Sequence, residues 1–323
     1  MFQYFVRRFL WAIFLFVSVT MITYVLFFLV PADPARLIAG KSATAADVAR
    51  VRHDYKLDRP VYEQYWRFFD QLVIHQSLGR SFANRRSVNE MVGQAAPVTA
   101  GLVAGGAILW MLIALPVGIL SALRPRSLLD RGAMIFVLVG ISAPVVWIGL
   151  LLQYFIGFRL AWTPNAGYCD VFNPPAGATC GGPWDWFYHM ILPWLTFAIL
   201  FAASYARMIR ANVMDVLGED YVRTARAKGV PEQQVIRRHV LRNALLPVVT
   251  MLGLDIGVAL GGAIFTESIF NLPGLGRLAV NSVFNLDLPT IQGVVVFATL
   301  AIILFNLIVD VLYAYIDPRI RLA

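Results

Sequence analysis

The sequence predicts an all-α polytopic membrane protein with six transmembrane helices. Its 323 residues are 59% hydrophobic and 14% charged, whereas soluble proteins average about 45–50% apolar and about 25% charged residues. Six apolar stretches are each long enough to cross a bilayer. The short loops that carry most of the Lys and Arg residues fall on one side of the alternating spans, as the positive-inside rule requires.

The six predicted spans cover residues 9–30, 96–123, 132–157, 189–208, 244–265 and 289–315. The second span is rich in small residues, including Gly101, Gly105 and Gly106, which let membrane helices approach closely. In the third span, Pro144 predicts a kink. The run between the fourth and fifth spans is polar and must lie outside the lipid, whereas residues 266–288, between the fifth and sixth spans, form an outer re-entrant or surface stretch.

An even number of spans puts both termini on the same side. Arg7 and Arg8 and the basic loops 123–131 and 207–242 all fall on that side, which the positive-inside rule identifies as the cytoplasm. PADP follows the first span in place of a small-residue cleavage site, which indicates an uncleaved anchor. We therefore divide the chain into an anchor (1–30), an extracytoplasmic segment (31–96) and a membrane core (97–323) with a cytoplasmic loop at 212–243.

The extracytoplasmic segment contains two stretches with helical spacing, which begin at Thr44 and Pro60. In the second stretch, Tyr62, Trp66, Phe69 and Val73 recur every three or four residues, as on one face of a helix. We expect these helices to pack on each other or to lie on the membrane surface.

The predicted outer loop at 158–188 contains the two cysteines of the chain, Cys169 and Cys180. Disulfides persist in oxidising compartments outside the cytoplasm. Asn-Pro-Pro and Gly between the cysteines form turns that could bring the ends of this loop together. The sequence thus predicts a disulfide, with two free thiols as the alternative.

The longest polar run in the C-terminal half covers residues 219–247, between the fourth and fifth spans. Glu219 and Asp220 suit the start of a first helix, because carboxylates are favoured at the positive end of the helix dipole. Gly229 predicts a left-handed cap after it, and Pro231 predicts the first turn of a second helix over about 231–242. A basic, ordered loop of this kind favours docking on a partner; the alternative is a surface loop that only holds its own helices together.

This loop resembles the EAA loop of ABC importer permeases, through Arg223-Thr224-Ala225 and, after three residues, Gly229. RTARAKG followed by RRHVLRNALLP is similar to the oligopeptide/dipeptide permease branch, which shares the Arg and Thr that replace the Glu and first Ala of the general pattern. In such permeases the loop is the coupling helix that fits a groove on a cytoplasmic ATPase. The resemblance implies an ATPase-coupling set of Arg223, Thr224, Ala225, Arg226, Gly229, Val230 and Pro231. Within this set, we expect Ala225 and Gly229 to form the contact point.

Three further blocks are similar to peptide permeases: 78–82 (LGRSF), 261–280 and 306–320. One departure is Leu286 before Asp287, where many relatives have Arg-Asp. Together with the loop, these blocks extend the resemblance across most of the chain.

Acidic residues within or beside membrane spans are functional candidates, because a carboxylate there costs several kcal/mol unless it is paired or hydrated. Asp255, in the middle of the fifth span, is a candidate pathway residue. Glu267 is a candidate gate residue, together with Pro273, Gly274 and Gly276 of the PGLG turn. Each acid could instead bond a neighbouring helix or a partner subunit, and for Asp310 we favour that structural role.

Several chemistries are not indicated by the sequence. The chain has no phosphate-binding GxxxxGK[ST] motif, no Ser/His/Asp set and no paired catalytic carboxylates, so we expect it to bind no cofactor and ATP with magnesium to be held by partner ATPases. The four histidines are scattered, and no metal site is expected. The basic residues are dispersed over membrane loops, which argues against nucleic-acid binding.

The resemblance implies a non-enzymatic permease subunit of an ABC peptide importer in a bacterial or archaeal plasma (inner) membrane. Its implied partners are a homologous second permease, cytoplasmic ATPase subunits, an extracytoplasmic substrate-binding protein and membrane lipid. Within the family, nickel, glutathione or another small solute is an alternative substrate. An alternative from another class is a secondary transporter or channel working alone, with Asp255 as its ion-coupling acid.

Overall fold

The computed structural model describes residues 2–28, 34–39, 43–54, 58–171, 180–260 and 263–316. Within these residues all regular elements are helical, and the only strand-like pairing is an isolated bridge between Arg80 and Ser87. The elements are α1 (Phe2–Phe28), α2 (Pro34–Ala39), α3 (Ala45–Asp54), α4 (Val61–Val73), α5 (Val88–Leu123), α6 (Leu128–Ser142), α7 (Val145–Leu152), η1 (Gln153–Arg159), α8 (Pro183–Leu217), α9 (Asp220–Ala227), α10 (Glu232–Gln234), η2 (Val235–Val240), α11 (Leu241–Ala244), α12 (Leu246–Leu260), α13 (Ile264–Ile269), α14 (Leu275–Phe284) and α15 (Leu288–Ile316). The prediction of an all-α protein is confirmed.

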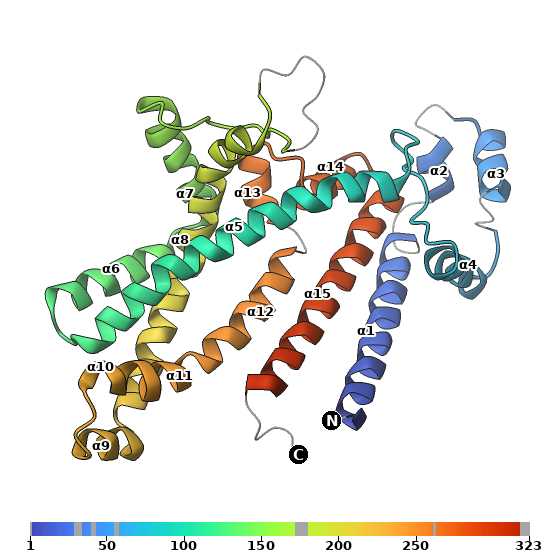
Figure 1. The fold of residues 1–323 in the computed structure, drawn as a ribbon. Helices are drawn as coiled ribbons and strands as arrows, with labels where there is room; N and C mark the ends of the chain where they lie inside the picture. Colours follow the sequence, from blue (N-terminus) through green and yellow to red (C-terminus); the bar gives the residue numbers. More distant parts are fainter. Residues whose placement is uncertain are drawn as a thin grey trace.

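The long helices connect two ends of the molecule (Figure 1). At one end lie the start of α1, the connection between α5 and α6, the helices α9 to α11 and the end of α15. At the other end lie α2 to α4, α7, α13 and α14. The basic loop between α8 and α12 is therefore on the same end as the first and last helical residues that the structure describes.

The described helices include four that are long and apolar enough to cross a membrane, and up to six spans when each bent helix pair is counted as one. The third predicted span is more than kinked, because α6 and α7 meet at an angle of 107°. Ala143, between them, has extended backbone angles (φ −83°, ψ 127°). Proline disfavours helical geometry in the residue before it, so Pro144 ends α6 and turns α7 aside.

The core is built on the contact between α5 and α8. Trp110 of α5 is fully buried and stacks on Phe201 of α8, with ring centroids 4.6 Å apart. A β-carbon at Gly105 would overlap the ring of Trp194, and one at Gly106 would overlap Phe197. The expectation that small residues in this helix permit close approach is confirmed, because large α8 side chains lie directly on the α5 backbone.

In the extracytoplasmic segment α2 packs on α3, whereas α4 contacts α1 through Tyr65 and Gln64. Four parts of the sequence interpretation lie outside the described residues. They are residues 29–33 with most of PADP, the turn residues between the cysteines (172–179), Gly261 and Gly262, and the basic end from 317 onwards. The side chain of Asp310 is likewise not described, so its role stays a prediction.

Candidate functional site

The loop between α8 and α12 is a compact helical hairpin. α9 ends in a Schellman motif, in which Val230 N donates to Ala225 O (3.3 Å) and Gly229 N donates to Arg226 O (2.9 Å). Gly229 has a φ of +77°, the left-handed conformation that glycine adopts without a Cβ clash. The predicted helix break at this glycine is confirmed.

Side-chain contacts across the break hold the hairpin closed. The guanidinium of Arg226 donates to both carboxylate oxygens of Glu232, over 3.0 and 2.7 Å. Asn243 Nδ2 donates to the Tyr221 hydroxyl over 2.8 Å and so ties α11 to α9. The second helix runs from Glu232 to Ala244 and contains the π-helical turn η2. One of these contacts lies beside the break and the other joins the start of α9 to α11. The two helices of the hairpin are therefore linked at both ends and form one rigid unit.

The hairpin has an apolar inner face that continues the core of the molecule. Val222 and Ala225 of α9 and Val235 and Val240 of η2 are buried in the same hydrophobic cluster as Val213 of α8. Ala225 is only 8% exposed, so the expectation that its side chain forms the ATPase contact point is corrected. Its spacing of three residues from Val222 places it on the inner face, where a small side chain lets α9 approach η2.

The outer face of the hairpin is exposed and basic. Arg223, Thr224, Lys228, Gly229 and Pro231 are exposed, and the Arg223 side chain retains 70% of its accessible surface. Val230 is half-buried beneath them. The structure thus presents most of the predicted coupling residues on one rigid, positively charged surface.

An ion pair that the sequence interpretation missed lies at the same end of the molecule. Arg210 of α8 donates to Asp130 of α6 through Nε (2.7 Å) and Nη2 (3.0 Å). The Asp130 carboxylate also accepts from the Ser121 hydroxyl and from Arg126 N. Ser127, three residues before Asp130, was a readable helix-cap signal, and its hydroxyl accepts from Asp130 N (3.2 Å). The pairing with Arg210 joins residues 80 apart in the sequence, and no local signal indicates it.

Asp255 lies between α12 and α8. The Tyr205 hydroxyl of α8 donates to Asp255 Oδ2 over 2.6 Å, and the aspartate is half-buried. The rings of Tyr205 and Trp110 are 5.8 Å apart, so the carboxylate sits at the edge of the α5–α8 aromatic core. Its hydrogen bond supports the helix-bonding alternative, while its partial exposure leaves the pathway role as a prediction.

Glu267 is fully buried and caps a helix of its own chain. Oε1 accepts from the Thr99 hydroxyl (2.7 Å), and Oε2 accepts from Arg277 N (3.0 Å) in the first turn of α14. Burial raises the pKa of this carboxyl group, and the hydrogen bonds oppose that shift. These hydrogen bonds support the structural alternative for Glu267, and its role as a gate residue stays a prediction.

The PGLG turn allows this capping. Gly274 is the N-cap of α14 and has no side chain to bond the helix start; a β-carbon there would overlap the carboxylate of Glu267. A β-carbon at Gly276 would lie 2.7 Å from the Ile264 Cα. Both glycines therefore permit close approach of α13 and α14, and Pro273 is exposed beside them. Their placement is one of packing, and a gating role for the three residues stays a prediction.

Asp287, which follows Leu286, binds the LGRSF stretch. Its carboxylate accepts from the Ser81 hydroxyl (2.5 Å), from Phe82 N (2.8 Å) and from the Thr290 hydroxyl (2.7 Å). The aspartate is 2% exposed. These contacts hold the stretch before α5 against the start of α15. They explain in structural terms why the LGRSF stretch and Asp287 occur together.

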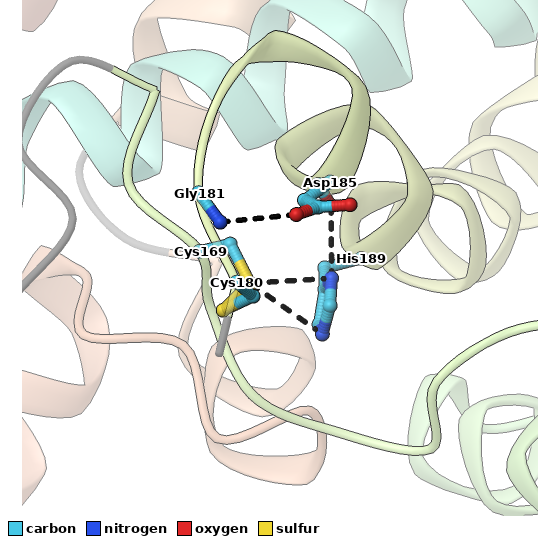
Figure 2. The surroundings of a disulfide bond; sticks show 5 residues. All are labelled: Cys169, Cys180, Gly181, Asp185 and His189. Atoms are coloured by element: carbon cyan, nitrogen blue, oxygen red, sulfur yellow. Dashed lines mark hydrogen bonds between the residues drawn. A yellow bond between two sulfur atoms is a disulfide. The ribbon is translucent and has the colours of Figure 1, made fainter. Parts of the chain in front are cut away.

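Cys169 and Cys180 are joined in a disulfide, with Cα atoms 5.8 Å apart. Figure 2 shows His189 beside it, with Nδ1 3.5 Å from Cys169 Sγ and 2.8 Å from Asp185 O. The two sulfurs and the imidazole bring three potential metal-ligand atoms within 4.8 Å of one another, a proximity that the scattered histidines did not indicate. Because a metal is bound by thiolates, the bonded sulfurs do not serve as ligands.

The long apolar helices and the bent helix pairs are those of a multi-pass membrane protein. The model of the binding-protein-dependent transport system inner membrane component matches residues 114–322, and the model of its N-terminal part matches residues 1–103. The chain belongs to this family: it is a multi-pass inner-membrane permease subunit of an ABC importer of the peptide/oligopeptide type. The alternative of a channel or secondary transporter working alone is thereby excluded.

The chain is similar to curated relatives along their whole length. It is 40% identical over 321 residues to a glutathione transport system permease protein GsiC from Pectobacterium atrosepticum and 41% identical to one from Salmonella paratyphi A, with 99% of each chain covered. The fold is also that of a chain in an inward-facing MetNI methionine ABC transporter, with a TM-score of 0.55 and 16% identity over 70% of this chain and 96% of that one.

Proposed function

We propose that this permease subunit imports short peptides and that glutathione is its first candidate substrate. The observation that supports this proposal is the 40% identity to glutathione permeases over 99% of both chains. Glutathione is itself a tripeptide, so the proposal narrows the peptide class that the sequence motifs imply.

The hairpin of α9 to α11 would couple import to ATP hydrolysis on separate subunits. It faces the cytoplasm in this proposal, as do both termini, and ATP and magnesium are held by the partner ATPases. α8 has 35 residues and is therefore about 52 Å long, so movement of the hairpin is carried along α8 towards the opposite end. The Arg210–Asp130 pair extends that movement to α6.

A complete importer would also contain a homologous second permease and an extracytoplasmic substrate-binding protein. Family membership supports such partners in general. Within this assembly the present chain forms part of the path and transmits force, and it performs no covalent chemistry.

Uptake by cells that carry or lack this chain tests the substrate. We expect deletion to abolish uptake of radiolabelled glutathione, and re-expression to restore it. Loss of dipeptide uptake with unchanged glutathione uptake would reject glutathione and retain the peptide class. Loss of Ni²⁺ uptake, with glutathione and dipeptide uptake unchanged, would reject both glutathione and the peptide class.

Charge reversal on the hairpin tests coupling. Arg223→Glu changes an exposed side chain whose ion pair with Asp220 is long (3.5 Å), so folding should be preserved while ATPase co-purification falls. Arg86→Glu is the matched control and should retain the ATPase, because Arg86 lies two residues before the start of α5, at the end of the molecule opposite the hairpin (Figure 1). Full ATPase retention and full uptake in Arg223→Glu would show that this surface is not the docking element.

A further inference from the structure

α4 carries an exposed apolar face. Tyr62, Trp66 and Val73 are 75%, 68% and 49% exposed, and Phe69 stacks on Trp66 with ring centroids 6.2 Å apart. Their spacing of three and four residues places all four side chains on one side of the helix. An aromatic surface of this kind normally has an apolar partner.

A different side of α4 contacts α1. The Tyr65 hydroxyl lies 3.1 Å from Thr20 Oγ1 and 3.3 Å from Val17 O, while the Tyr24 hydroxyl donates to Gln64 Oε1 over 3.2 Å. In Figure 1 α4 is seen nearly end-on beside α1, which runs across the view, so α4 crosses α1.

These contacts determine which way the exposed face points. Gln64 is hydrogen-bonded to α1 at residue 24. The Tyr65 ring contacts Tyr24, with ring centroids 5.8 Å apart, while its hydroxyl extends to residues 17 and 20. Residue 20 lies about 6 Å further from the outer end of α1, at 1.5 Å per residue. On the surface of α4, the Tyr65 side therefore faces closer to the middle of the α1 span than the Gln64 side does. Successive residues are about 100° apart around a helix. Going around α4 from Gln64 past Tyr65 in the same direction, the next side chains are Phe69, Tyr62, Val73 and Trp66.

The opposite rotation reaches charged side chains. Glu63 and Arg67 form an ion pair of 2.7 Å on that side, together with Gln71. α4 thus directs its aromatic face towards the middle of the span and its charged face towards the outer end.

The depth of α4 matches the edge of a bilayer. The apolar span of α1 is Val6–Leu26, with its midpoint near residue 16. Thr20 and Tyr24 are then about 6 and 12 Å from the midplane, at 1.5 Å per residue. The hydrocarbon core ends about 15 Å from the midplane, so α4 lies about 3–9 Å inside that boundary. Interfacial helices bury their apolar faces to about 5–10 Å.

We propose that α4 is an interfacial anchor in the outer leaflet, with Tyr62, Trp66, Phe69 and Val73 among the acyl chains. Glu63 and Arg67 then lie among the headgroups. Trp and Tyr are the residues enriched at this depth. The occupant of the aromatic face is lipid and not a soluble protein, because the face points away from the outer water.

Spin labels on adjacent residues test the anchor. Trp66→Cys and Arg67→Cys are made in the full chain, assembled with its transport partners in phosphatidylcholine and phosphatidylglycerol nanodiscs, and labelled without reductant. The parent chain, similarly treated, measures background from the bonded cysteines. Electron paramagnetic resonance then compares collisions with oxygen, which concentrates in lipid, and with a water-soluble nickel chelate.

The label at position 66 should collide several-fold more with oxygen relative to nickel than the label at position 67. Equal nickel access at both positions would overturn the proposal. So would high nickel access at 66 that falls when the substrate-binding protein is added, because the face would then be a protein-docking site. Tyr62→Cys gives the same comparison if the Trp66 variant does not assemble.

Discussion

Removing the charge of Asp130 should destabilise the end of the molecule that holds the coupling hairpin. In Asp130→Asn, Arg210 loses its anionic partner and one of its two hydrogen bonds, of 2.7 and 3.0 Å, because only the amide oxygen can still accept. Breaking a buried pair by removing one partner costs about 3–5 kcal/mol. The Asp130 side chain is 7% exposed and the Arg210 side chain is 24% exposed. Because solvent reaches part of Arg210, we expect Asp130→Asn to lower the free energy of unfolding by about 2–3 kcal/mol.

Equilibrium unfolding of the purified chain in mixed detergent micelles measures this loss. Arg210→Gln should cost a similar amount, and the double variant should cost less than the sum of the two, with a coupling of about 1–3 kcal/mol. Glu90→Gln is the matched control, because its ion pair with Arg86 (2.8 Å) has side chains that are 48% and 54% exposed. An exposed pair of this kind contributes less than about 1 kcal/mol. Wild-type stability of Asp130→Asn, or additive single losses, would refute the reasoning.

Three further outcomes are expected. Asp255→Asn should assemble normally, because its amide oxygen can still accept from Tyr205, and should lower uptake per assembled complex; wild-type uptake removes Asp255 from the pathway. Cys169 and Cys180 should resist alkylation in freshly isolated membranes until reductant is added, and reduction should destabilise the chain by about 3 kcal/mol or less for a loop of this size; complete labelling without reductant contradicts the bond. Gly229→Ala should cost about 1–2 kcal/mol from its positive φ alone, since a β-carbon there meets no atom within 4 Å, and Gly229→Val should cost more and release the ATPase. Retention of the ATPase by both variants in pull-downs would show that the cap geometry is not needed for docking.

The sequence determined the features that contiguous residues encode. A span is recognised from the length of its apolar run, and sidedness from the charges that flank it. The helix break at Gly229 follows from the backbone preferences of glycine and of Pro231, which act over one turn. The helical spans and the break depend on local chemistry, so the structure reproduces them, whereas the sidedness stays a prediction.

Tertiary contacts decided the role of individual side chains. Ala225 was assigned to a contact point, but its side chain is buried in the cluster that includes η2. The sequence left a gate and a structural role open for Glu267, and its hydrogen bonds to Thr99 and α14 favour the structural one. Pro144 indicated a bend, and the turn onto α7 gave its size, 107°. Burial and hydrogen-bond partners depend on residues that are distant in the sequence; Thr99 and Glu267, for example, are separated by 168 in residue number. The pattern around one residue does not encode which distant residue will contact it.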